Sequence, residues 1–405
     1  MNAFKKVLAI VLAMVLALSF AACSGKPASE GEGSTAQTAD IKVGAIYINS
    51  KNDTAGYTFA HHNGIVTAMK KLGLDTEKQL FIVDEVPEDK QQVLTAIDTL
   101  VGEGADIIFG ISFGYIDAME EAAKEYPNVI FSHGTGYKSN STNFNNYFGR
   151  AYQARYLSGI AAGLKSLETK NNEIGYVAAF GTDYAETASG INGFALGVQA
   201  VNPDATVHVK TLGAWADEVN ESAFATELIN TYKCGVIAQH CDSAQPQIAA
   251  EKAGVFGCGY NSDMTKDAPK AHLTAAIWNW DVYYATAIQA AIDCGSADKF
   301  VETMGTPAYY GGLKEGFVDV APLSENCVAG TDKAIEAVRK LIVDGEWDVF
   351  SGVKLSVDAE GNVTKTDAPL MDNTGKEIVA AGGKSVEDSV ITGSMNYYVA
   401  GVVEH

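Results

Sequence analysis

The feature that most constrains this fold is a repeated alternation of short apolar runs with stretches of helical spacing. It is clearest at residues 107–115, Ile-Ile-Phe-Gly-Ile-Ser-Phe-Gly-Tyr, where β-branched and aromatic residues end at a glycine-bounded turn. Residues 116–126 then show helical spacing with a polar face. Repeated strand–turn–helix units of this kind demand a parallel sheet with helices on both of its faces.

The alternation occurs in two halves, each with four strand–helix units. Strands are predicted at residues 41–48, 80–83, 107–110 and 129–132, and again at 173–179, 205–211, 235–238 and 255–259. Extended connectors near residues 145–150, 273–280 and 311–320 predict a hinged α/β body of two lobes. The predicted organisation is lobe 1 at 41–148, lobe 2 at 149–278, a return to lobe 1 at 279–318, and a third crossing with a C-terminal segment at 319–405. In that segment a helix is expected at 332–341, followed by short strands whose path stays open.

The N-terminal region has the pattern of an export signal followed by a tether. Lys5 and Lys6 precede an apolar run at residues 7–18 that is too short to span a membrane comfortably. Ala21 and Ala22 then precede Cys23, which resembles the lipobox of bacterial lipoproteins and predicts a lipid on Cys23 after removal of residues 1–22. An ordinary secretory signal with an incidental cysteine is the alternative. Residues 23–40 are rich in small and polar residues and predict a flexible tether.

The net charge of the chain disfavours polyanionic partners. The chain has 29 basic and 50 acidic residues, and without Lys5 and Lys6 the balance is 27 − 50 = −23. That sign opposes binding to nucleic acid or to anionic lipid headgroups. The protein is expected to be exported and to be anchored by its lipid on the extracytoplasmic face of the cell membrane.

The remaining cysteines do not form a metal-binding pattern. Cys234, Cys241, Cys258, Cys294 and Cys327 show no C-x-x-C spacing. Buried free thiols are expected, and one disulfide among the first three is left open.

Ligands of open parallel sheets bind at the carboxyl ends of the strands, and this rule selects the candidate site. The loops there carry aromatic side chains, polar side chains and the turn after residue 110. The candidates are Tyr57, Phe113, Phe180 and Trp215, then Asn52, Asp53, Asp242 and Asp263, and finally Ser112 and Gly114. Lys and Arg are scarce in these loops, which disfavours a phosphate-bearing ligand. A flat, neutral, nitrogen-rich ring or a sugar ring fits aromatic faces and hydrogen-bonding edges.

Gly110-x-Ser112-x-Gly114 also matches the nucleophile elbow of α/β-hydrolases. Only two strand–helix units precede Ser112, however, and the one His-Gly pair that could help form an oxyanion hole, His133-Gly134, follows the serine. The turn is therefore better interpreted as one that presents backbone amides and a phenyl ring to a cleft. A serine hydrolase stays a minor alternative, and no catalytic activity is expected.

Other chemistry finds little support in the sequence. His61 and His62 are neighbours on a helix and share no face, and His240-Cys241-Asp242 alternates faces on a strand end. No phosphate-binding loop and no dinucleotide-binding fingerprint is present. Neither a metal nor a cofactor is expected.

The sequence resembles the basic membrane protein (BMP) family of ABC-transporter substrate-binding lipoproteins, which includes purine nucleoside receptors. The resemblance covers nearly the whole mature chain. It rests on residues 53–61 (Asp-Thr-Ala-Gly-Tyr-Thr-Phe-Ala-His), 108–115, 134–137 (Gly-Thr-Gly-Tyr), 147–150 (Tyr-Phe-Gly-Arg), 191–194 (Ile-Asn-Gly-Phe), 202–205 (Asn-Pro-Asp-Ala), 239–243 (Gln-His-Cys-Asp-Ser) and 263–264 (Asp-Met). The related branch usually carries Trp where this chain has Tyr57, and its aspartate commonly lies one residue closer to the glycine.

The resemblance implies a two-lobed fold like that of type I periplasmic binding proteins, each lobe with a doubly wound parallel sheet. It also implies capture of a purine base or nucleoside for import by an ABC permease. Tyr57 and Phe113 would stack from one lobe, and Trp215 and Asp242 would face them from the other. Asp263 and either Asn52 or Asp53 would add polar contacts. A monomer is expected.

Two rival functions stay open at this point. A binding protein for a sugar or another small neutral solute has the same fold class and also uses stacking aromatic side chains. A sensor for a membrane kinase would differ only in its partner.

Overall fold

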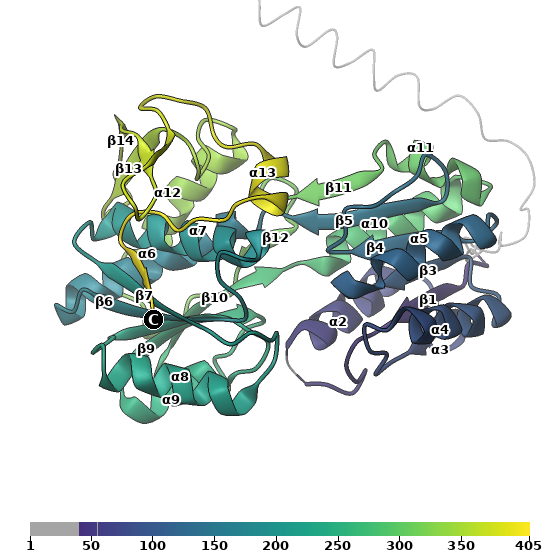
Figure 1. Cartoon of the computed structure of the whole chain (residues 1–405), viewed down its shortest axis with the longest axis horizontal. Coiled ribbons are helices and arrows are strands. Elements are labelled where there is room, and N and C mark those ends of the chain that lie inside the picture. Colours follow the sequence, from purple (N-terminus) through teal and green to yellow (C-terminus); the bar gives the residue numbers. More distant parts are fainter. Residues whose placement is uncertain (1–39, 55) are drawn as a thin grey trace, which may run out of the picture. The chain divides into compact units, whose positions relative to one another are not determined.

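The computed structural model describes residues 40–54 and 56–405, so the predicted signal, Cys23 and nearly all of the predicted tether lie outside the described residues. The described chain forms two α/β lobes, each built on one large sheet (Figure 1). Within these residues, no helix is both long and apolar enough to cross a membrane.

Lobe 1 is built on a six-stranded, entirely parallel sheet. Its strands, in spatial order, are β11 (Ala308–Gly311), β5 (Phe144–Gly149), β4 (Ile130–Gly134), β3 (Ile107–Gly110), β1 (Val43–Ile46) and β2 (Leu80–Val83). The helices of this lobe are α2 (Gly56–Lys71), α3 (Thr76–Gln79), α4 (Lys90–Gly102), α5 (Ile116–Glu125), α10 (Trp280–Asp293) and α11 (Phe300–Met304). Ile97, Ile108 and Met119 belong to the core that α4 and α5 form with the sheet. Helices α2 and α10 pack against each other.

Lobe 2 is built on a seven-stranded sheet. Its strands, in spatial order, are β12 (Val318–Val320), β10 (His272–Trp278), β9 (Phe256–Asn261), β8 (Val236–His240), β6 (Glu173–Ala178), β7 (Thr206–Thr211) and β17 (Val402–Glu404). Its helices are α6 (Ala151–Thr169), α7 (Ala185–Val201), α8 (Glu218–Asn230), α9 (Gln245–Ala253) and α12 (Thr331–Val343). The predicted α/β class with parallel sheets is confirmed.

One strand of lobe 2 departs from the predicted parallel arrangement. β12 pairs with β10 in antiparallel register, Ala276 opposite Val320 and Trp278 opposite Val318. The reason is the path of the chain, because β10 leads out of lobe 2 whereas β12 leads back in from β11. The chain passes between the sheets three times, after β5, after β10 and between β11 and β12. The hinge role of these crossings and the lobe boundaries drawn from them stay predictions.

The structure defines the path of the C-terminal segment, which the sequence left open. Helix α12 packs on α6, and the hairpin of β13 (Val353–Val357) and β14 (Val363–Asp367) packs near α7 and α12. A second hairpin joins β15 (Leu370–Met371) and β16 (Glu377–Val379). Helix α13 (Asp388–Gly393) follows and contacts α7, and β17 then pairs in parallel with β7 at the edge of the sheet.

Glycines bring α6 and α7 unusually close together. A Cβ atom on Gly197 would lie 2.0 Å from the carbonyl oxygen of Tyr156, and one on Gly159 would lie 2.2 Å from that of Phe194. Both contacts are with backbone atoms, which cannot rotate away as a side chain can. The two helices cover the sheet of lobe 2 as one layer because these positions have no side chain.

Replacing Gly197 with Ala should therefore destabilise the protein by about 1–3 kcal/mol, the usual cost of overpacking. The matched control is Gly102→Ala at the end of α4, where no atom lies within 4 Å of the added methyl group. That control should leave the free energy of unfolding unchanged or raise it by up to about 1 kcal/mol. Urea unfolding followed by circular dichroism measures both values. Equal stabilities for the two variants would contradict the packing argument.

Candidate functional site

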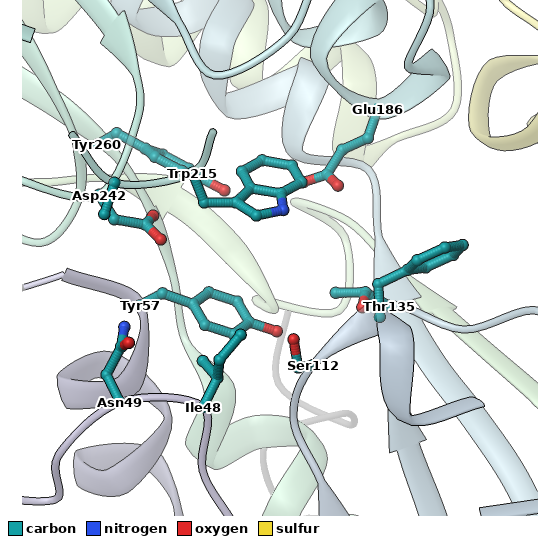
Figure 2. A pocket seen from close by; sticks show the side chains of 11 residues that line it. Ile48, Asn49, Tyr57, Ser112, Thr135, Glu186, Trp215, Asp242 and Tyr260 are labelled. Carbon is teal, nitrogen blue, oxygen red and sulfur yellow. The ribbon is translucent and has the colours of Figure 1, made fainter. Parts of the chain in front are cut away.

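A cavity of about 200 Å³ is lined by residues of both lobes. Lobe 1 supplies Ile48, Asn49, Tyr57, Ser112, Phe113 and Thr135, and lobe 2 supplies Glu186, Trp215, Ala216, Asp242 and Tyr260. In Figure 2 the ring of Tyr57 and the indole of Trp215 face each other across this space. The carboxyl groups of Asp242 and Glu186 lie on the side of lobe 2.

The sheet topology explains why residues so distant in sequence meet here. Ile48 follows β1, Ser112 follows β3, and Thr135 follows β4. From the other lobe, Trp215 follows β7 and Asp242 follows β8. Parallel strands place their carboxyl ends at one edge of a sheet, where ligands of such sheets bind. The cavity therefore lies between two edges of that kind.

Tyr57, in the first turn of α2, is fixed in place by contacts within lobe 1. Its hydroxyl donates to the carbonyl oxygen of Ile111, and its ring meets the His61 ring edge-on with 4.3 Å between centroids. His61 is buried, stacks on Trp280 at 3.9 Å and hydrogen-bonds to the Tyr284 hydroxyl at 2.5 Å. Burial raises the pKa of Tyr57 well above its usual value. The ring thus presents a neutral, preoriented aromatic surface to the cavity.

Trp215 is fixed on the opposite side by other aromatic rings. Its ring meets Phe180 edge-on at 5.1 Å and Tyr184 edge-on at 5.6 Å. Its carbonyl oxygen accepts a 2.9 Å hydrogen bond from the amide of Asp242, which links the two cavity residues. Rings held in this way bind a flat ligand without first losing rotational freedom.

The two lobes touch directly beside the cavity. Gly56 has φ +82°, and a Cβ atom there would lie 2.6 Å from the carbonyl oxygen of Asp242. A second contact joins the ring of Phe113 in lobe 1 to that of Tyr184 in lobe 2, with centroids 5.8 Å apart. The lobes are therefore in contact beside the cavity in this structure, and the absence of a side chain at Gly56 leaves room for that contact.

The two carboxyl groups of the cavity are unusually hard to ionise. Burial, together with the negative charge of Glu221, raises the pKa of Asp242 to about 7, although a 3.0 Å hydrogen bond from Asn261 opposes the rise. Burial also raises the pKa of Glu186 to about 8, although the positive charge of Arg155 opposes it. Groups with such pKa values can donate or accept a hydrogen bond near neutral pH, according to the ligand.

A buried cation lies behind this wall. Arg155 is only 2% exposed, its guanidinium lies 4.0 Å from the ring centroid of Tyr260, and it donates to the carbonyl oxygen of Gln239. His240 lies 3.6 Å from a carboxylate oxygen of Glu186, beyond hydrogen-bonding distance, and burial holds its pKa well below the usual value. The histidine is therefore neutral, and the positive charge that acts on Glu186 is that of Arg155.

The structure brings together five of the ten predicted site residues. Tyr57, Ser112, Phe113, Trp215 and Asp242 line the cavity. The other five, which do not line it, are Asn52, Asp53, Gly114, Phe180 and Asp263. Among them, Phe180 supports Trp215, and Asp263 is exposed and accepts hydrogen bonds from Thr265. Their binding roles stay predictions for which this geometry offers no direct contact.

Sequence reasoning missed Glu186 and Tyr260. Glu186 lies in the first turn of α7, a few residues beyond the end of β6, so extending the strand-end rule by one helical turn would have found it. Tyr260 lies within β9 itself, and no sequence signal separates its orientation from that of an ordinary core tyrosine. Thr135 directly follows β4, so the strand-end rule applies to it, but it was not among the candidates.

The geometry at Ser112 does not fit a nucleophile elbow. Its backbone is extended, with φ −110° and ψ 146°, whereas an elbow holds its serine in a strained turn. Its hydroxyl donates to a carboxylate oxygen of Glu88 at 2.6 Å, and the same oxygen accepts from the amide of Gly114 at 2.7 Å. His133 contacts the carbonyl oxygen of Ser112 rather than its hydroxyl. Glu88 thus fixes the turn that carries Phe113.

Within residues 40–54 and 56–405 the structure has five free thiols, at Cys234, Cys241, Cys258, Cys294 and Cys327. The disulfide left open among the first three therefore does not form here. Over the same residues, no three His, Cys, Asp or Glu side chains gather as a metal site would require.

Residues 41–350 match the sequence model of a family described as ABC transporter substrate-binding protein PnrA-like. A purine-binding protein of Brucella abortus is 33% identical over 362 residues, which cover 89% of this chain and 93% of that protein. A putative ABC transporter glucose-binding protein of Haloferax volcanii is 33% identical over 325 residues, covering 80% and 76%. The solved ABC transporter solute-binding protein of Conexibacter woesei has a TM-score of 0.60 at 18% identity, covering 76% of this chain and 98% of that one, and so shows the same fold. The resemblance inferred from the sequence motifs is confirmed.

The two carboxyl groups make the stability of the ligand-free protein depend on pH. Asp242 and Glu186 have folded-state pKa values of about 7 and about 8, whereas carboxyl groups of unfolded chains titrate near 4. Between these values the folded protein binds more protons than the unfolded chain, so the free energy of unfolding should fall as pH rises from about 5 to about 8.

The variant Glu186→Gln should flatten this dependence, because its amide does not titrate. The exposed Glu302→Gln is the matched control and should keep the slope of the unmodified protein. Urea unfolding at several pH values within this range measures the slope. An unchanged slope in Glu186→Gln would show that Glu186 is not protonated in the folded state.

Proposed function

Because the chain belongs to the PnrA-like family of ABC transporter substrate-binding proteins, we propose that it captures a purine base or nucleoside by closing its lobes around the ring. The observation that carries this proposal is the pair of fixed rings, Tyr57 and Trp215, on opposite sides of one cavity. A flat heterocycle between them would stack on both lobes and so stabilise the closed form. The bound ligand would then be presented to an ABC permease.

The edges of the cavity support a nitrogen-rich ring. Asp242 and Glu186 place carboxyl oxygens on one side, and Asn49 and Ser112 line the other side. Carboxyl groups that are only partly ionised near pH 7 can meet either ring nitrogens or N–H groups. The volume of about 200 Å³ is below the roughly 300–1,000 Å³ typical of pockets for drug-sized ligands, which favours a small ring system.

A sugar is the second candidate for the ligand. The Haloferax volcanii relative is named for glucose, and its identity of 33% equals that of the relative named for purine. Aromatic side chains also stack on sugar rings, so the two ligand classes differ in the groups that they offer to the polar side chains of the cavity.

Titrations of adenine, adenosine, guanosine and glucose, followed by tryptophan fluorescence and calorimetry, distinguish the two ligand classes. Binding of glucose alone would overturn the purine assignment.

Trp215 should account for a large part of the affinity. Stacking of a base on an aromatic side chain contributes about 1–3 kcal/mol, so Trp215→Ala should weaken adenosine binding by roughly 5-fold to 150-fold. Trp215→Phe keeps an aromatic face and should lose much less. Val219→Ala, at an exposed position of α8, is the control and should bind as the unmodified protein does. Isothermal titration calorimetry gives each dissociation constant. Equal affinities for Trp215→Ala and Val219→Ala would contradict the stacking argument.

We also propose that Cys23 carries the lipid that anchors the protein on the extracytoplasmic face of the membrane. The support is the Ala21-Ala22-Cys23 pattern after an apolar run. Cys23→Ala should move the protein from the membrane fraction to the soluble exported fraction, whereas Cys294→Ala should leave it on the membrane. Fractionation and mass spectrometry of the N-terminal peptide test this. Retention of Cys23→Ala in the membrane fraction would exclude a lipid anchor at this residue.

A further inference from the structure

Two of the three crossings between the lobes are joined to each other by hydrogen bonds. The first crossing runs from β5 into α6, and the third runs from β11 to β12. The amide of Arg150 donates to the carbonyl oxygen of Gly311 at 2.7 Å. The amide of Leu313 donates to the side-chain oxygen of Gln153 at 3.0 Å. A rotation about one of these segments therefore disturbs the other.

Glycines let the two crossings approach each other closely. A Cβ atom on Gly149 would lie 2.6 Å from the carbonyl oxygen of Gly311. A Cβ atom on Gly312 would overlap the side-chain oxygen of Gln153. The two segments thus form one packed joint, and not two independent linkers.

The side chain of Arg150 extends this joint to the C-terminal segment. Its Nη1 donates to the carbonyl oxygen of Tyr310 in β11 at 2.7 Å, and its guanidinium lies 4.9 Å from the ring centroid of the same tyrosine. Its Nε and Nη2 both donate to the carboxylate of Asp388 in α13, the Nε contact being 3.1 Å. A bidentate pair of this kind fixes orientation as well as distance. The guanidinium therefore links β11 of lobe 1 to α13.

Helix α13 is itself attached to lobe 2. It contacts α7, and its residue Ile391 is fully buried. Farther along the segment, Asn192 of α7 donates to the carbonyl oxygen of Tyr397 at 2.8 Å and accepts from the amide of Val399 at 2.9 Å. The family match ends at residue 350, so this attachment lies outside it. The C-terminal segment thus connects lobe 2, through Arg150, with the edge strand of lobe 1.

We propose that Arg150 is a positioning residue for the two lobes, and that Asp388 of α13 holds it in place, so that the C-terminal segment strengthens ligand binding from outside the cavity. The contacts of Arg150 stabilise the arrangement in which Tyr57 and Trp215 lie across one cavity. Without them the lobes separate more readily, and fewer molecules are competent to bind. The apparent dissociation constant then rises in inverse proportion to that fraction.

The exposure of the ion pair limits the size of the effect. The side chain of Asp388 is 41% exposed and that of Arg150 is 26% exposed. Pairs in contact with solvent contribute little unless their geometry is bidentate, as it is here. The expected effect of breaking the pair is therefore a shift in the population of lobe arrangements and not a loss of the fold.

The first test breaks the pair with Asp388→Asn. The matched control is Glu387→Gln, an exposed neighbour whose side chain does not cap α13. Calorimetry should show that Asp388→Asn weakens the binding of adenine and of adenosine by the same factor, roughly twofold to fivefold, because a population shift multiplies every dissociation constant alike. Stopped-flow tryptophan fluorescence should assign this loss to faster dissociation. Glu387→Gln should leave both dissociation constants unchanged.

A second test needs no ligand. Hydrogen–deuterium exchange, followed by mass spectrometry, should be faster in Asp388→Asn for peptides that cover residues 145–155 and 308–316, because the joint opens more often. Arg150→Lys should behave in the same way, since an ammonium group cannot reproduce the planar fork of the guanidinium. Asp388→Glu keeps a carboxylate and should restore most of the affinity and of the slow exchange. Glu387→Gln should exchange as the unmodified protein does.

Three results would overturn the inference. Unchanged affinity in Asp388→Asn is the first, and unchanged exchange at the two crossings is the second. The third is an unequal loss for adenine and adenosine, which would mean that Asp388 acts by touching the ligand, since it also lines a hollow beside the cavity.

The affinity measurements rest on the proposed function, whereas the exchange measurements do not. Failure of the unmodified protein to bind either adenine or adenosine would overturn the proposed function, and exchange at the crossings would still decide whether Asp388 holds the joint. Circular dichroism and thermal unfolding establish that each variant folds. Should Asp388→Asn fail to fold, Arg150→Lys breaks the same bidentate pair from its other side.

Discussion

The common direction of the strands in each sheet is the constraint on which the site depends. Parallel strands put all their carboxyl ends at one edge, and the three crossings turn the edge of one lobe toward that of the other. Ser112, Trp215 and Asp242 are far apart in the sequence, yet each follows the end of a strand. No local motif could assemble such a site, because its parts come together only when both sheets are complete.

Burial between the lobes gives the site its electrostatic character. Beside the contact of Gly56 with Asp242, the carboxyl groups of the cavity are shielded from water, and this burial raises their pKa values toward neutrality. Arg155 moderates the rise at Glu186 from behind Tyr260 without entering the cavity. Although the chain has 50 acidic and 29 basic residues, the carboxyl groups of this cavity can therefore donate as well as accept a hydrogen bond near neutral pH.

Much of this organisation could be predicted from the sequence, and the failures have physical causes. The alternation of apolar runs and helical spacing predicted the α/β class, and the strand-end rule selected Tyr57, Phe113 and Trp215. It also selected Asp53 and Asp263, because sequence cannot tell which residue of a loop turns inward. Tyr260 was missed because its orientation depends on the register of β9 against β8 and β10. The ion pair between Arg150 and Asp388 could not be predicted, because the two residues lie 238 positions apart in the sequence.

The position of the last strand has a consequence for how the polypeptide can mature. β17, at residues 402–404, completes the sheet of lobe 2, and β11, at residues 308–311, completes that of lobe 1. A chain emerging from the ribosome therefore lacks an edge of each sheet until three quarters or more of it has been synthesised, and non-local pairing of this kind is slow. Neither lobe can therefore complete its sheet until most of the polypeptide has been synthesised, so the last residues of the chain take part in the final step of folding.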